Sequence, residues 1–305
     1  MPDVFSPLEK LPQLGETMSI VSALVWASST ILFRIVGQKI HALGLNLFKN
    51  ILSFLLLALS MAVLRESVFP SVPPVLYVLF FLSGVIGIAV SDTLFLVALH
   101  KLGAELTAIV DCAYSPFVIG LSFLFLGEKM SLVQTLGVVL IVAAVLLITL
   151  RKSDSQIRRR DLVTGIGVGV LAMFFTAAGI VMIKPGLGRI SLVWAGFIRM
   201  AGGASAAVIL VGAHPRRRLI LTPRLYLENL KLLVPASILA STISMELWMA
   251  GMKYTQASIA SALNQLNTIF IFILAAIFLK ERVSLVKLAA VALAFAGAVF
   301  VSVSL

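Results

Sequence analysis

Glu128-Lys129-Met130-Ser131-Leu132-Val133 and Glu281-Arg282-Val283-Ser284-Leu285-Val286 are two copies of one motif, Glu-basic-x-Ser-Leu-Val, set 153 residues apart. Sliding the chain over itself by this distance aligns 91–143 with 244–296 without a gap and places Asp111 over Asn264. A fixed-period match of this length indicates an internal duplication.

The composition around the motif is that of a membrane protein. Hydrophobic residues make up 60% of the 305 residues and charged residues only 12%, with a mean hydropathy of +1.10, whereas soluble domains carry about 25% charge. A helix needs about 20 mostly apolar residues to cross the hydrocarbon layer of a bilayer. Runs of that kind lie approximately at 18–37, 45–64, 75–100, 104–126, 131–150, 163–183, 190–213, 231–253, 257–279 and 284–304.

These runs divide into five per copy. The fold expected is all-α and integral to the membrane, with ten transmembrane helices as two five-helix repeats, 18–150 and 163–305, joined by a basic linker, 151–162, and preceded by an N-terminal tail, 1–17. The tail does not have the basic start of a secretory signal peptide. Because five crossings is an odd number, the second repeat must enter from the opposite face. Inverted repeats of this kind are typical of alternating-access transporters, although duplication for stability alone is the alternative.

The chain resembles the EamA family of the drug/metabolite transporter superfamily from about Ser19 to Ser302. The residues that carry the resemblance are Ser91-Asp92-Thr93-Leu94-Phe95, Ala98-Leu99, Tyr114-Ser115-Pro116, Phe125-Leu126-Gly127-Glu128-Lys129, the run 137–145, Phe278-Leu279-Lys280-Glu281-Arg282 and the run 293–299. The resemblance implies a carrier of small metabolites and specifies no substrate. The second copy departs from the first by having Ile269 in place of Pro116, so a helix bend at Pro116 is not expected in the other half.

Two cations stand inside the apolar runs at comparable depths. Lys49 and Arg199 lie eight residues past His41 and Ser191. A charge near the bilayer centre costs roughly 2.5–3.5 kcal/mol on insertion scales, so it should face the bundle and have a partner. One interpretation is that both cations line a shared cavity and bind an anionic or zwitterionic substrate; the other is that they snorkel to an interface or pair with internal acids.

Three acids also lie well inside the runs: Asp92, Asp111 and Glu246. A carboxylate poised between desolvation and a nearby cation can take up and release a proton during transport. Asp92 is the first choice as proton-coupling residue, with a structural salt bridge as the alternative.

Neutral polar and aromatic residues complete the candidate substrate site. Asn264, Gln265, Asn267 and Thr268 span more than half a turn, so they cannot all hide on one packing seam. Asn264 and Gln265 could contact substrate together with Tyr114, or could bond helix to helix. Trp26 and Trp248 could wall a pocket or serve as core packing, whereas Trp194 is expected to anchor at the interface.

Other conspicuous residues are interpreted as structural. Glu128 and Glu281 can cap the following helix and pair with a basic neighbour. Small residues are expected at close helix approaches, namely Gly165, Gly167, Gly169, Gly202, Gly203, Ala204 and Ser205.

The sequence indicates neither an enzyme nor a cofactor. The single Cys112 and the scattered His41, His100 and His214 form no metal or nucleophile motif, and no P-loop is present. The net charge of +11 reflects basic helix ends, so nucleic acid is not an expected partner; the partners expected are a small-molecule substrate and the lipid bilayer. An intramembrane enzyme and a structural bundle are the alternatives.

A multi-pass protein of the cell membrane is therefore expected, with oligomeric state, coupling ion and direction open. The orientation is contested. The joints that hold Arg216, Arg217 and Arg218 carry most of the basic residues and should be cytoplasmic, which puts both termini outside, whereas the family resemblance implies cytoplasmic termini.

Overall fold

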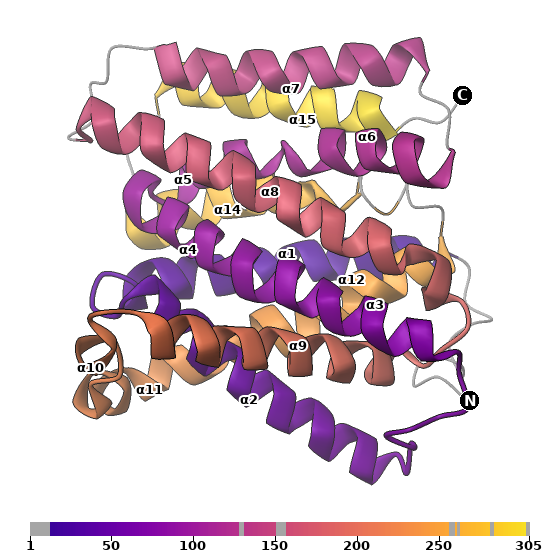
Figure 1. The fold of residues 1–305 in the computed structure, drawn as a ribbon. Coiled ribbons are helices and arrows are strands. Elements are labelled where there is room, and N and C mark those ends of the chain that lie inside the picture. Colours follow the sequence, from indigo (N-terminus) through magenta and orange to yellow (C-terminus); the bar gives the residue numbers. More distant parts are fainter. Residues whose placement is uncertain are drawn as a thin grey trace.

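Long helices lie side by side along one direction in the computed structural model (Figure 1). The structure describes residues 13–127, 131–150, 157–255, 260, 263–280 and 284–302. The first repeat contains α1 (Leu14–Val36), α2 (Ala42–Val63), α3 (Pro74–Gly84), η2 (Val85–Val90), α4 (Ser91–Leu102), α5 (Ala104–Asp111), α6 (Tyr114–Leu126) and α7 (Leu132–Leu150). The second contains α8 (Arg159–Leu187), α9 (Leu192–Ala213), α10 (Arg217–Ile220), α11 (Pro223–Ile238), η3 (Leu239–Ser244), α12 (Met245–Tyr254), α14 (Leu266–Leu274), η4 (Ala275–Leu279) and α15 (Leu285–Ser302).

Several of these elements join end to end into helices that can cross a membrane. Within the described residues, seven continuous helices are long and apolar enough, among them Pro74–Leu102, Ala104–Leu126 and Pro223–Tyr254, and three further apolar helices are shorter. The all-helical membrane fold is thus confirmed, and the count of ten crossings stays a prediction. The crossing predicted at 231–253 begins earlier, at Pro223, because proline is favoured in the first turn of a helix.

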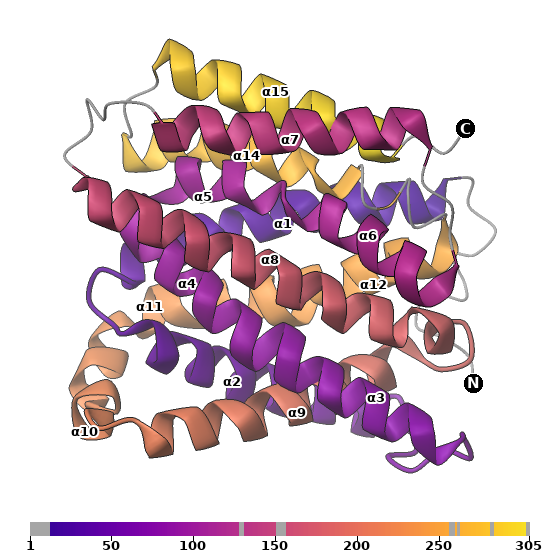
Figure 2. The same ribbon diagram turned by 45° about the horizontal axis from the view of Figure 1, so that its top comes forward.

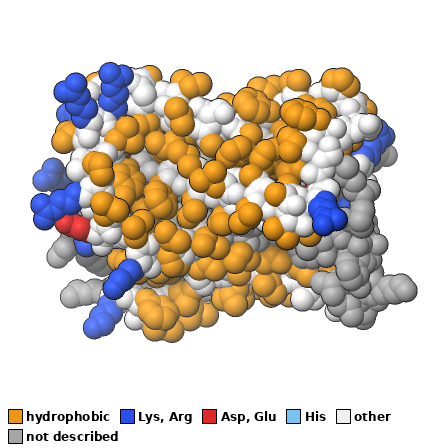
Figure 3. Space-filling model, turned by 90° about the horizontal axis from the view of Figure 1, so that it is seen from below, with side chains coloured by type: hydrophobic (Ala, Val, Ile, Leu, Met, Phe, Trp, Pro, Cys, Tyr) orange, Lys and Arg blue, Asp and Glu red, His pale blue; other side chains and the backbone are white. Residues whose placement is uncertain are grey.

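The outer surface has the distribution of side chains that a bilayer requires. Figure 3 shows hydrophobic side chains covering the middle of one face, with Lys and Arg at its two ends. The exposed apolar residues include Leu55, Leu59, Leu124 and Ile209, each more than half exposed. Large apolar patches of this kind are rare on soluble monomers and are stable against lipid. The chain is a multi-pass membrane protein.

The two repeats pack against each other reciprocally. Equivalent helices meet at two edges, α2 with α9 and α7 with α15 (Figures 1 and 2). Between these edges, α1 packs against α11, η3 and α12, while its counterpart α8 packs against α3, η2 and α4. In Figure 1, α1 and α8 begin at opposite ends of the bundle.

Single hydrogen bonds repeat this relation. The Ser91 hydroxyl donates to the Ala172 carbonyl at 2.8 Å, and the Ser244 hydroxyl donates to the Ser22 carbonyl at 3.2 Å. Ser91 and Ser244 are equivalent in the 153-residue register, and Ser22 precedes Ala172 by the distance that separates Lys49 from Arg199. The duplication is therefore a near-twofold relation in space as well as in sequence.

Irregular turns also recur at equivalent places. The π-helical segment η2 precedes α4 and its counterpart η3 precedes α12. The fourth helix is interrupted between Asp111 and Tyr114, and the chain before α14 has a turn at the equivalent Gln265. The interruption lies before Pro116, which is inside α6, and its counterpart lies before Ile269, which is inside α14, so the expectation about a bend at Pro116 stays a prediction. π-Bulges and broken helices are frequent at functional sites.

Two glycines allow the backbones of α3 and α9 to approach closely. A Cβ added at Gly84 would lie 1.9 Å from the Arg199 carbonyl oxygen, and one added at Gly202 would lie 2.1 Å from that of Phe81. The prediction of close helix approach is confirmed here and at Gly203, Gly165 and Gly169, but is wrong for Gly167, which has nothing within 4 Å of a Cβ.

Gly202→Ala is expected to lower the free energy of unfolding by about 1–3 kcal/mol, because the two backbones must separate to admit the methyl group. Gly212→Ala is the matched control on the same helix, since nothing lies within 4 Å of its Cβ. Thermal unfolding in detergent measures both variants. Equal melting temperatures for the two would contradict the close approach.

Trp194 is not an interfacial anchor, contrary to expectation. It is 1% exposed, its indole Nε1 donates to the Val68 carbonyl at 3.0 Å, and its ring lies edge-on to Tyr77, with centroids 4.9 Å apart. The segment between α2 and α3 folds back over the indole and provides the acceptor that a lipid interface would otherwise supply.

Candidate functional site

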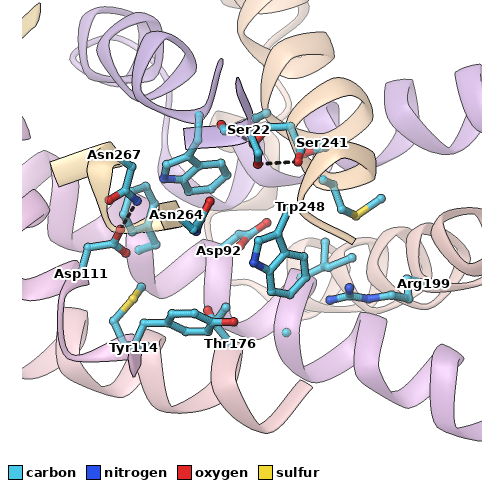
Figure 4. A pocket seen from close by; sticks show the side chains of 18 of the residues that line it. Ser22, Asp92, Asp111, Tyr114, Thr176, Arg199, Ser241, Trp248, Asn264 and Asn267 are labelled. Carbon is cyan, nitrogen blue, oxygen red and sulfur yellow. Dashed lines mark hydrogen bonds between the residues drawn. The ribbon is translucent and has the colours of Figure 1, made fainter. Parts of the chain in front are cut away.

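A cavity of about 120 Å³, part of it open to solvent, lies between the two repeats. Elements of both repeats line it, as Figure 4 shows for a part of the set. The lining residues are Ser22, Trp26, Gly87, Ile88, Asp92, Phe95, Asp111, Tyr114, Met173, Thr176, Arg199, Met200, Ala240, Ser241, Ser244, Met245, Trp248, Asn264, Gln265 and Asn267.

The structure brings together most of the residues predicted from the sequence. Of the predicted substrate and proton-coupling residues, all but Lys49 and Glu246 line this cavity. They come from helices far apart in the chain, so the helix packing assembles the site. Their individual roles stay predictions.

Lys49 forms an ion pair instead of lining the cavity. Its side chain is 3% exposed, and its Nζ donates to Oδ2 of Asp92, whose side chain is 19% exposed. This is the pairing that the sequence analysis gave as the alternative. The Asp92 carboxylate therefore lines the cavity, and Lys49, which does not line the cavity, balances its charge.

Asn46 supports this region from one turn earlier on α2. Its amide donates to the carbonyls of Ile88 and Ala89 and to the Thr93 hydroxyl. A π-helical turn shifts backbone hydrogen bonds from their usual partners. The buried Asn46 amide donates hydrogen bonds to two carbonyls near the end of η2. Asn46 was not predicted from the sequence, although an amide three residues before Lys49 in an apolar run was a usable signal.

Arg199 has the largest unsatisfied hydrogen-bonding capacity in the cavity wall. The residue is 3% exposed, and its Nε and Nη1 are buried without a hydrogen-bond partner in the described part of the chain. Its guanidinium carbon lies 5.6 Å from the centroid of the Trp248 ring. An unsatisfied buried donor costs about 1–3 kcal/mol, which an anionic ligand group bound in a bidentate manner would offset.

Glu246 contributes charge to the same region without lining the cavity. Its carboxylate is close enough to Arg199 for Coulombic attraction, as is that of Asp92. A Cβ at Gly196 would lie 2.0 Å from Oε1 of Glu246, so only glycine leaves room for this carboxylate against α9. Gly196 and Asn46 are 150 residues apart, as are Arg199 and Lys49, so they occupy equivalent places in the two repeats. The first repeat has the Asn46 amide at this place, and the second has the space that admits the Glu246 carboxylate.

Asp111 lies where the fourth helix is interrupted. Its Oδ2 accepts a hydrogen bond from Asn267 Nδ2 at 2.8 Å, and no ion pair of Asp111 is found among the described residues. The neighbouring Gln265 Nε2 donates to the Ser115 hydroxyl at 2.7 Å, while its Oε1 is buried without a partner in the same part of the chain. Asp111 is therefore bonded by a neutral amide and not by a cation in the described part of the chain.

Aromatic rings form the walls between these polar groups. Trp26 packs on Phe95, with ring centroids 5.4 Å apart, and Trp248 lies 6.4 Å from Tyr114. Trp26 and Trp248 are partly exposed and line the cavity, so they do more than fill the core. The Tyr114 hydroxyl is buried and has no hydrogen-bond partner among the described residues.

Three methionines in the wall were not predicted from sequence. Met173, Met200 and Met245 line the cavity from α8, α9 and α12. An apolar residue in an apolar run carries no signal that it faces a cavity. Methionine is flexible and polarizable, so these side chains can adapt to ligands of different shape.

The motif glutamates Glu128 and Glu281 lie outside the described residues, and their predicted structural role stays a prediction. The histidines are less scattered than the sequence indicated. His41 and His214 lie at one end of the bundle with ring centroids 5.6 Å apart. Burial, followed by the charges of His214 and Arg216, lowers the pKa of His41.

Comparison with known proteins identifies the architecture. The model of the EamA-like transporter family matches residues 13–150 and 163–303, one match per repeat. A search of curated proteins finds no match. A solved structure described only as the crystal structure of a protein superposes with a TM-score of 0.67 at 15% identity, covering 94% of this chain and 95% of that chain. At that identity the likeness concerns the fold alone.

Proposed function

Because the chain belongs to the EamA-like transporter family, whose members are in general transporters of small molecules rather than enzymes, we propose that it is a secondary carrier. It moves a small polar metabolite across the cell membrane by alternating access. The observation that carries the proposal is the cavity between two reciprocally packed repeats, lined by polar residues of both. A near-twofold relation lets one site face either side as the repeats rock.

Arg199, Tyr114, Trp26, Trp248, Asn264 and Gln265 form the substrate site in this proposal. Lys49 acts through Asp92, because its ammonium group is bonded to that carboxylate and does not line the cavity. Placing the end that holds Arg216, Arg217 and Arg218 in the cytoplasm follows from the positive-inside rule.

Purified protein in proteoliposomes is expected to show saturable flux of one metabolite class from a pooled panel of amino acids, sugars and phosphorylated compounds. The panel is tested with and without a pH gradient. Absence of flux under every gradient, with the protein folded, would transfer support to the intramembrane enzyme or the structural bundle.

We assign proton coupling to Asp92, with Asp111 and Glu246 as the other acids near the cavity. Protonation of Asp92 would release Lys49 from its ion pair, so proton binding alters a contact between α2 and α4. The double variant Lys49→Gln/Asp92→Asn avoids an unpaired charge. It is expected to retain downhill exchange and to lose the response to a pH gradient. A full response in this variant would assign coupling to another group.

A further inference from the structure

Arg199 is the one cation that lines the cavity in the described part of the chain, and Asp92 and Glu246 attract it without occupying its Nε and Nη1 donors. Arg199 enters from α9 with two buried nitrogen donors that bond to nothing in the described part of the chain. The guanidinium carbon lies 5.6 Å from the centroid of the Trp248 ring. A guanidinium presents its donors in one plane, which matches the two oxygens of a carboxylate better than a single acceptor atom.

The cavity also carries one acid without a cationic partner among the described residues. Asp111 is held by the amide of Asn267, and Asn264 and Gln265 lie in the same part of the wall. Asp92, the other lining carboxylate, is balanced by Lys49. An ammonium group of a ligand would therefore find its counter-charge at Asp111.

The two charges stand at opposite sides of the cavity. Figure 4 shows Asp111 and Arg199 apart, with Tyr114 and Trp248 between them. The guanidinium carbon of Arg199 lies 5.6 Å from the Trp248 centroid, which lies 6.4 Å from the Tyr114 centroid. Asp92 and Thr176 also lie between them in Figure 4, and the charge of Asp92 is balanced by Lys49.

We propose that the cavity takes a zwitterion whose carboxylate and ammonium groups are several bonds apart, as in ω-amino acids and short peptides. The carboxylate binds Arg199 and the ammonium binds Asp111. An α-amino acid carries both groups on one carbon and can engage only one end at a time. This substrate class rests on the proposed carrier function and makes it specific.

Two isomers test the separation directly. Norleucine and 6-aminohexanoate have the same atoms and the same charges and differ in the distance between them. Hexanoate and hexylamine each keep one charge. Binding to purified protein is followed by tryptophan fluorescence, because Trp26 and Trp248 line the cavity.

6-Aminohexanoate is expected to bind at least about tenfold more tightly than norleucine, hexanoate or hexylamine, since each of these loses at least one charged contact. Arg199→Gln should reduce its affinity to that of hexylamine, and Asp111→Asn to that of hexanoate. Lys101→Gln, which alters the exposed pair with Asp161, is the control and should leave all four affinities unchanged.

Equal or tighter binding of norleucine would overturn the proposal, as would an unchanged preference for 6-aminohexanoate in either cavity variant. Because binding is measured at equilibrium and without transport, its outcome tests the zwitterion site independently of the carrier function. The expected binding order without flux in proteoliposomes would refute the carrier and leave the zwitterion site standing. Flux that favours norleucine would support the carrier function and refute the zwitterion site.

Discussion

Asp92→Leu is expected to lower the free energy of unfolding by about 3–5 kcal/mol, because it leaves the Lys49 ammonium buried without a counter-charge. Lys49 is 3% exposed and bonds to this carboxylate. Thermal or denaturant unfolding of the detergent-solubilised protein measures the loss. Few single substitutions have an effect this large.

The double variant Lys49→Met/Asp92→Leu should recover most of that loss, since a well-packed apolar pair often replaces a buried ion pair without cost. Lys101→Met is the external control. Its pair with Asp161 is 35% and 44% exposed, and solvent-exposed pairs contribute about 1 kcal/mol or less. A double variant no more stable than Asp92→Leu would show that the pair does not hold α2 to α4.

Arg199→Gln is expected to reduce transport efficiency by about 30-fold or more, the consequence of losing about 2 kcal/mol or more from a buried charged contact with substrate. Stability should fall less than in Arg34→Gln, because the loss is limited to Coulombic attraction by Asp92 and Glu246. Two guanidinium nitrogens have no hydrogen-bond partner in the described part of the chain, so the substitution removes unsatisfied donors rather than structural bonds. Flux in proteoliposomes and thermal unfolding are measured on the same preparation.

Arg34→Gln is the control and is expected to lower stability without reducing transport. Arg34 Nη1 donates to the carbonyls of Leu99 and His100, each at 2.8 Å, so its loss should lower the melting temperature and leave substrate binding intact. If Arg199→Gln destabilises as much as Arg34→Gln and keeps its flux, Arg199 is a structural residue.

The sequence predicted the fold and much of the cavity because a bilayer makes polar residues informative. Asp111, Asn264 and Arg199 stood out in apolar runs, and all three line the cavity. The same logic could not distinguish Lys49 from Arg199, since equivalent positions in a duplicated chain look alike. Only the packing of α2 on α4 shows that Lys49 already has a partner.

Other features were beyond prediction for a different physical reason. The turn before α14 is at Gln265, which bonds to Ser115 across the bundle, and the local sequence has no proline to indicate it. Trp194 was expected at the interface because the pattern could not show that Val68 would fold back over it. Met173 and Met200 were hidden among other apolar residues. Each of these depends on a contact between segments far apart in the chain.

In the proposed carrier, the replacement of Asn46 by Gly196 at equivalent places has a consequence for how tightly substrate binds on the two sides of the membrane. A scaffold that is nearly twofold but holds an amide in one half and a carboxylate in the other has two access states of unequal energy. The substrate then meets different affinities on the two sides, because a ligand shifts an equilibrium only by its differential affinity for the states. A carrier running without a gradient must have the same ratio of Vmax to KM in both directions. The inequality therefore appears as a higher KM on one side, matched there by a proportionally higher Vmax.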